Sequence, residues 1–145
     1  MPFVDALGAP ARLHLVEIDD EGRLFKLARP LPYRGALGDF EVPIDFVTDF
    51  ASVPRFLWSI VGPYGRHTRA AVLHDWLYSS KIVSRREADA LFRRAMRELG
   101  VVGWRRWGMW AAVRLFGWTA WHGWSVKRGL LELKIRVGLA KRALD

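Results

Sequence analysis

Hydrophobic and polar residues alternate along residues 12–18 and again along residues 23–27. This period of two is typical of strands that bury one face. The segment between them, Asp-Asp-Glu-Gly at residues 19–22, has the composition of a turn, so the pattern predicts a β-hairpin. Prolines interrupt the stretch that follows and leave room for short edge strands near residues 39–42 and 46–48. The first third of the chain is therefore predicted to be mostly strand and loop.

The period changes to that of a helix in the middle of the chain, where helices are predicted over residues 54–60, 67–80 and 85–99. Ser52 ahead of a proline in the first turn is typical of a helix start. The Ser-Arg-Arg-Glu sequence at residues 84–87 is a capping box for the third helix. These elements predict an α+β fold, in which a small N-terminal β-hairpin or antiparallel sheet packs against a mostly helical C-terminal two-thirds.

A fourth helix is predicted over residues 104–124, which contain six of the eight tryptophans. Two interpretations stay open: a wholly buried central helix, or an interfacial helix whose indoles lie at headgroup depth while its arginines reach water. No transmembrane helix is expected, because Arg114 lies at the middle of the segment. Residues at steps of three and four share one face, and a second apolar set lies opposite: Trp104, Trp107, Ala111, Leu115, Trp118 and Trp121 against Met109, Val113, Phe116 and Ala120.

The last predicted helix, over residues 125–144, has a coiled-coil-like apolar seam surrounded by basic residues. The seam would pack on the domain itself or on a partner helix. We expect a single domain over residues 1–145, with a β-rich part (1–50), motif helices (51–103) and the tryptophan-rich and basic helices (104–145).

Composition and charge narrow the possible chemistry. The chain has no cysteine, which excludes disulfides, thiolate nucleophiles, zinc–cysteine sites and iron–sulfur clusters. The net charge is +8, and the last 42 residues hold nine Lys and Arg against two acids. Such a segment attracts phosphates of lipid or nucleic acid, or an acidic protein, unless it is only a solvated face. Nucleic acid ranks last, because the basic residues ring their helix. The N-terminus does not resemble a signal peptide, so folding in the cytosol is expected.

The chemistry is predicted to centre on His74, Asp75 and Tyr78, which lie within five residues of one helix. His74 and Tyr78 are four residues apart and share a face, whereas Asp75 points about 100° away. A base generally needs an acceptor on its second ring nitrogen, and Asp89 on the antiparallel helix that follows is the natural candidate. We expect Asp89 to clamp the imidazole of His74 while the free nitrogen opens onto a cleft. The alternative is a buried polar network that fixes the register of two helices.

The His-Asp-Trp-Leu-Tyr sequence at residues 74–78, followed by Asp89, resembles the paired helices of calcium-dependent secreted phospholipases. By that resemblance His74 would activate water and Asp75 would bind Ca²⁺ or another divalent cation. Asp89 and Tyr78 would hold the histidine in place.

A broader set of motifs resembles a family of unknown function encoded by phages and prophages. The motifs are TDFASVPR at residues 48–55, HDWLY at 74–78 and SRxxAD at 84–89. In the first motif Asp49 would add an oxygen ligand beside Asp75, with Ser52, Arg55 and Arg85 in supporting positions. The plain alternatives are a turn cap for Asp49, a helix cap for Ser52 and a carboxylate partner for Arg55.

Two functions follow from these patterns. The first is a phage-encoded, metal-assisted hydrolase with His74 as general base, acting on an ester or amide of a lipid or of the cell envelope. Trp104, Trp107, Trp118 and Trp121 would attach it to a membrane surface. The second is a non-catalytic virion or assembly protein that binds phage structural proteins through residues 104–144. Under either function, the protein is expected in the host cytoplasm after synthesis, and then in the phage particle or at the membrane surface.

Overall fold

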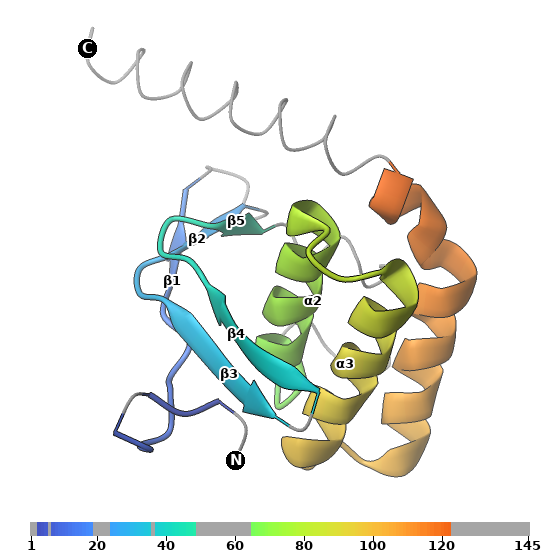
Figure 1. Cartoon of the computed structure of the whole chain (residues 1–145), viewed down its shortest axis with the longest axis horizontal. Coiled ribbons are helices and arrows are strands. Elements are labelled where there is room, and N and C mark those ends of the chain that lie inside the picture. The colour runs from blue at the N-terminus through green and yellow to red at the C-terminus, as the bar shows by residue number, and fades with distance from the viewer. Residues whose placement is uncertain (1–2, 6, 19–23, 36, 49–64, 123–145) are drawn as a thin grey trace, which may run out of the picture.

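The computed structural model describes residues 3–5, 7–18, 24–35, 37–48 and 65–122. Strands occupy the N-terminal part and helices the C-terminal part, which confirms the predicted α+β class. Figure 1 shows the strands on one side, followed by α2, then α3, then a helix over residues 103–122, coloured orange. We call this last element the tryptophan-rich helix. The helices predicted over residues 54–60 and 125–144 lie outside the described residues.

The two strands of the predicted hairpin, together with a third strand, form an antiparallel sheet in the order β1-β2-β5. Strand β1 (Leu15–Glu17) pairs with β2 (Phe25–Leu27), and β2 pairs with β5 (Val47–Thr48). The sheet ends at Thr48, directly against α2.

A second sheet of two strands was predicted only in part. Strand β4 (Gly38–Val42) matches the expected edge strand, but its partner β3 (Leu31–Gly35) was not predicted. The reason is Pro32, which lies inside β3 opposite Glu41. Proline is tolerated in an edge strand, and a sheet of two strands consists of edges only.

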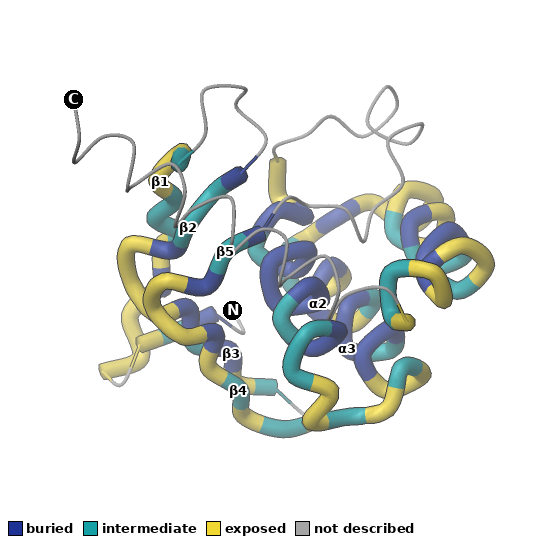
Figure 2. Tube along the Cα trace, turned by 90° about the horizontal axis from the view of Figure 1, so that it is seen from above, coloured by how far each residue is buried: buried dark blue, intermediate teal, exposed yellow. Residues whose placement is uncertain are grey.

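The helices follow the predicted bounds closely. Helix α2 spans Thr68–Ser80 and helix α3 spans Arg85–Glu98. The capping box is present, since the Ser84 hydroxyl accepts from the Glu87 amide and the Glu87 carboxylate accepts from the Ser84 amide. The two helices lie side by side in the ribbon of Figure 1 and in the tube of Figure 2, because only four residues join them.

The hydrophobic core lies between the strands and α2. Every residue from Ala70 to Asp75 is buried, which makes α2 dark blue along this stretch in Figure 2. Apolar side chains from both sheets, from α3, from the tryptophan-rich helix and from the N-terminal segment complete the core, among them Phe3, Leu27, Tyr33, Val42, Phe92, Met109 and Val113. Helix α2 is therefore the central element, and any polar side chain that it carries inward must find a partner within the protein.

Candidate functional site

His74, Tyr78 and Asp89 meet between α2 and α3. The His74 Nε2 atom lies 2.7 Å from Asp89 Oδ1, and the Tyr78 hydroxyl donates to the same oxygen at 2.6 Å. The rings of His74 and Tyr78 lie 4.1 Å apart between centroids, as two residues one turn apart on a helix should. The contact expected between Asp89 and His74 is thus present, and all three residues are fully buried.

Two arginines, one from the tryptophan-rich helix and one from α3, connect this cluster to the tryptophan-rich helix. Arg114 donates to Asp89 Oδ2 at 2.7 Å. Arg85, one turn before Asp89 on α3, donates to the main-chain carbonyls of Val113 and Arg114 at 2.9 and 2.6 Å. Its Nε atom lies 4.0 Å from Asp89 Oδ2. The site therefore joins three helices through one buried carboxylate.

Arg114 is the site residue that the sequence analysis missed. Its position in the middle of an otherwise apolar helix was the available signal, since such a cation usually has a specific partner. The sequence could not name that partner, because 25 residues separate Arg114 from Asp89.

The electrostatics of the cluster favour a charged carboxylate beside a neutral imidazole. Burial lowers the pKa of His74, and the positive charge of Arg85 adds to this, although Asp89 opposes it. Burial alone would raise the pKa of Asp89. Hydrogen bonds from His74, Tyr78 and Arg114 outweigh burial and hold the pKa below its usual value. Burial, followed by the hydrogen bond to Asp89, raises the pKa of the Tyr78 hydroxyl, which therefore stays protonated.

Among the described residues no cleft is found at the free nitrogen of His74, which differs from the sequence prediction. The side chain is fully buried, because α2 runs through the centre of the core. Within the described part of the chain, the buried Nδ1 atom has no hydrogen-bond partner. A cavity of about 670 Å³ does occur among the described residues, but it lies at the start of α2 and is lined by Arg12, Arg66 and Arg69 rather than by His74.

Asp75 faces the strands instead of the His74 cluster. The Thr48 hydroxyl at the end of β5 donates to Asp75 Oδ2 at 2.5 Å, and both residues are buried. Asp49, Ser52 and Arg55 lie outside the described residues. Among the residues that are described, no three His, Asp or Glu side chains are grouped closely enough to hold a metal ion. Asp75 and a hydroxyl alone do not meet the six to eight oxygens that Ca²⁺ takes.

Gly117 sets how closely the tryptophan-rich helix approaches the site. A Cβ atom at this position would lie 2.8 Å from the Tyr78 hydroxyl oxygen, and that ring cannot move freely because it is bonded to Asp89. Gly108 in the same helix has no atom within 4 Å of the corresponding point. The two glycines therefore form a matched pair in one helix.

Alanine at these two glycines is expected to have opposite effects on stability. Gly108→Ala should raise the free energy of unfolding by about 1 kcal/mol through helix propensity. Gly117→Ala should lower it by about 1 kcal/mol or more, because overpacking outweighs that gain. Urea denaturation of the two variants measures the difference. Equal stabilisation by both would contradict the close contact with Tyr78.

The tryptophan-rich helix is not the wholly buried helix that was one of the two interpretations. It buries Met109, Ala112, Val113 and Gly117, whereas its opposite face is exposed. Phe116, which was placed with Met109 and Val113 on the face opposite the tryptophans, is exposed as well. Among the described residues, no helix is long and apolar enough to cross a bilayer.

Trp121, which was grouped with the interfacial tryptophans, belongs instead to the packing of the helix. Its ring meets Tyr78 edge-on at 5.2 Å between centroids. The Lys81 ammonium lies 4.4 Å from the same ring and donates to the Trp121 carbonyl. Trp121 is half-buried for these reasons.

Fold and site together define an α+β protein with a buried histidine–aspartate–arginine centre shared by three helices. Comparison with known families matches residues 25–113 to the family described as "Protein of unknown function (DUF1353)". The chain belongs to this family, and the matched region includes His74, Tyr78 and Asp89.

A curated relative extends the similarity beyond that region. The uncharacterized protein y4jT of Sinorhizobium fredii is 34% identical over 108 residues, which is 70% of this chain and 32% of that protein. The chain therefore spans about a third of the length of this relative. No solved structure matches the chain.

Proposed function

We propose that the chain is a hydrolase in which His74 acts as the general base through Nδ1. The observation that carries this proposal is the difference between the two nitrogens of the imidazole ring. Nε2 is held by Asp89, which Tyr78 and Arg114 fix in turn, and Nδ1 is left as a buried nitrogen without a partner among the described residues. Such an orphaned polar atom costs about 1–3 kcal/mol and needs an explanation.

The neutral state of His74 suits this role. When Nε2 carries the ring proton and donates a hydrogen bond to Asp89, the lone pair of the neutral ring lies on Nδ1. There it can accept a proton from water. The water oxygen then bonds to the carbonyl carbon of the substrate, the bond to the leaving oxygen or nitrogen breaks, and the proton on Nδ1 passes to that leaving atom. Asp89 keeps the tautomer and the orientation of the ring throughout, as the carboxylate of a catalytic triad does.

A divalent cation at Asp75 is a separate proposal, and no step is routed through it. The described residues provide one carboxylate and one hydroxyl there. Asp49, the second proposed ligand, lies outside them. Ca²⁺ would polarise the carbonyl group if further ligands complete such a site.

The proposed substrate is an ester or amide of a lipid or of the cell envelope, and the proposed setting is a phage or prophage. The resemblance of the three sequence motifs to phage-encoded proteins supports the setting. For residues 104–144, the proposed partner is a membrane surface or a phage structural protein, since the segment is rich in Trp, Lys and Arg.

A second candidate function has its own supporting observation, the complete burial of the His74 ring. In this case the cluster is a brace that fixes the register of three helices, and the protein is a non-catalytic component of a virion. Catalysis requires that the side chains over Nδ1 move aside to admit water and substrate, whereas a brace requires no such movement.

His74→Gln, tested on ester and amide substrates, separates the two functions. We expect the variant to lose about a hundredfold or more of the hydrolytic rate while it unfolds cooperatively. His122→Gln, at an exposed histidine, is the matched control and should keep the full rate. Nitrogen-15 NMR of the wild-type ring provides a second readout, which does not require the variant to fold. The proposal fails if the wild type hydrolyses none of the substrates, or if Nδ1 carries the proton.

A further inference from the structure

One face of the tryptophan-rich helix is apolar and exposed. Its large residues are Trp104, Trp107, Leu115 and Trp118, with exposed fractions of 63, 50, 68 and 55%. We call these four residues the indole face. They fall within one side of the helix because they follow one another at steps of three, eight and three residues. Single exposed apolar side chains are normal, but several large ones on one face mark an interaction surface.

The indole face is accompanied by arginines. The Arg105 guanidinium lies 5.1 Å from the centroid of the Trp104 ring. From α3, the Arg93 guanidinium lies 4.5 Å from the Trp107 ring and 5.3 Å from the Trp110 ring. These distances are typical of cation–π contacts, so the two guanidinium groups lie against the indole rings.

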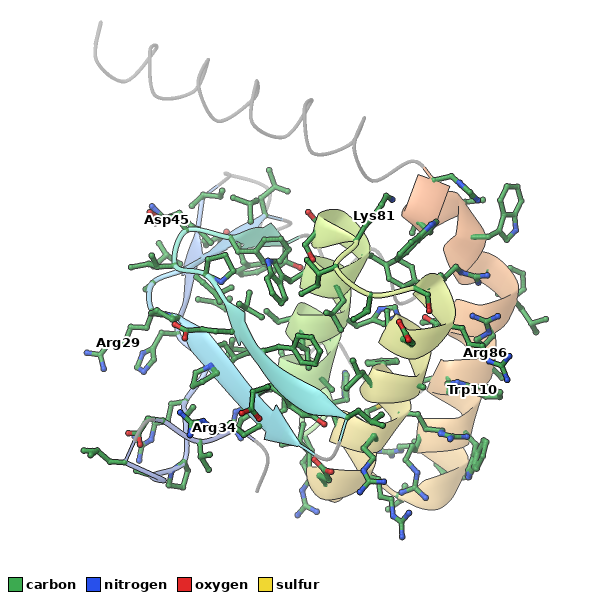
Figure 3. The ribbon with its side chains drawn as sticks, in the orientation of Figure 1. Arg29, Arg34, Asp45, Lys81, Arg86 and Trp110 are labelled. Carbon is green, nitrogen blue, oxygen red and sulfur yellow. The ribbon has the colours of Figure 1, made fainter. Side chains whose placement is uncertain are left out.

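Acidic residues are absent from this part of the sequence. No Asp or Glu occurs from residue 99 to residue 122, and residues 123–145 add six Lys and Arg against two acids. Figure 3 shows the labelled Trp110 on the side of the molecule away from the strands, far from the labelled Asp45. The tryptophan-rich helix itself therefore carries charges of one sign only, and a surface complementary to it must be negative.

A bilayer fits these features better than a protein partner. Trp and Arg side by side suit the boundary between headgroups and acyl chains, where the indole is apolar with one polar edge and the guanidinium meets phosphate. A bilayer also accepts positive charges at any spacing, whereas a protein partner needs carboxylates at matched positions. At 1.5 Å per residue the indole face extends about 21 Å along the helix axis, which suits a helix lying in the plane of the membrane.

We propose that the indole face docks on the surface of an anionic phospholipid bilayer. The three indoles lie at headgroup depth, Leu115 points toward the acyl chains, and Arg93 and Arg105 pair with lipid phosphates. The contacts of Gly117, Trp121 and Arg114 with the other helices hold this helix against the protein. The docking proposal goes beyond hydrolysis at His74 and holds equally if His74 is only a brace.

Co-sedimentation of the full chain with vesicles tests the proposal. Phosphatidylcholine vesicles containing phosphatidylglycerol should bind the protein about tenfold or more tightly than phosphatidylcholine alone, and added salt should weaken the binding. The double variant Trp104→Ala/Trp118→Ala should lose about tenfold or more of the affinity for the anionic vesicles. Ile44→Ala, at an exposed apolar residue on the strand side, is the matched control and should bind as the wild type does.

Three results would overturn the docking proposal. The first is no binding of the wild type to anionic vesicles. The second is equal binding by the double variant, which would assign the attraction to the basic sequence of residues 123–145. The third is a dimer in sedimentation velocity that the double variant dissolves, without vesicle binding, which would make a second copy of the chain the occupant. None of these results depends on hydrolysis, so this proposal and the one at His74 fail separately.

Discussion

Asp89→Ala is expected to lower the free energy of unfolding by about 3–5 kcal/mol, since removing one partner of a buried charged network leaves the others uncompensated. Asp89 accepts hydrogen bonds from His74, Tyr78 and Arg114, which come from two different helices. Without the carboxylate, the Tyr78 hydroxyl is orphaned in the core and the Arg114 guanidinium loses its counter-charge. Urea denaturation followed by far-ultraviolet circular dichroism measures the loss.

Glu87→Ala provides a matched control for Asp89→Ala. Glu87 is also a carboxylate of α3, but it is exposed and its role is to complete the capping box. Removing the Glu87 carboxylate should lower the free energy of unfolding by about 1 kcal/mol. Asp89→Asn keeps the shape and one acceptor oxygen, so it should fall between the two alanine variants. A cost for Asp89→Ala no greater than that for Glu87→Ala would show that the cluster does not brace the three helices.

The contact between His74 and Asp89 was predictable because each step was local. Helical spacing places His74 and Tyr78 on one face, the capping box at Ser84 fixes where α3 begins, and a four-residue connection makes the helices antiparallel. None of these steps requires a distant part of the chain. The burial of the ring was not predictable in the same way, because it depends on strands and on a further helix that pack around α2.

The tryptophan-rich helix shows why the contacts between distant parts of the chain could not be predicted from the sequence. Apolar residues occur on both of its sides, so periodicity gives two faces and no means of choosing which one meets the core. The choice is made by contacts far apart in the chain. The absence of a side chain at Gly117 leaves room for the Tyr78 hydroxyl, and Arg114 donates a hydrogen bond to Asp89. Lys81 makes a cation–π contact with the Trp121 ring. A helix that has apolar residues on both sides and lies at the edge of a small protein must leave one of them exposed, and here the exposed face carries the indoles.

The stability of the folded protein should fall as the pH drops below about 6.5, the ordinary pKa of histidine. Burial lowers the pKa of His74 in the folded state, so below about pH 6.5 the unfolded chain binds a proton that the folded protein does not. Unfolding then takes up a proton, and acid favours it. The expected loss approaches about 1.4 kcal/mol per pH unit and ends where the folded-state pKa is reached. Urea denaturation at a series of pH values measures this slope.

His74→Gln should remove most of this slope, because glutamine does not titrate. The lowered pKa of Asp89 acts in a different window: its contribution is present above about pH 4, the ordinary pKa of aspartate, and is lost only as the pH falls further. The charged groups that surround the ring, Arg85, Arg114 and Asp89, stay in the variant. The difference between wild type and variant between about pH 5 and pH 6.5 therefore reports on His74 alone.

Equal slopes in the wild type and in His74→Gln would mean only that folding does not lower the pKa of His74. If the wild type instead loses stability relative to His74→Gln as the pH rises above about 6.5, the folded protein holds His74 as an imidazolium whose pKa is raised. Both ring nitrogens would then carry protons, and the imidazolium would form an ion pair with Asp89. Nδ1 would have no lone pair with which to accept a proton from water, so the general-base proposal would fail on stability data alone, without any substrate. The same slope thus decides between a neutral base and a charged brace, because only the neutral ring destabilises the folded state in acid.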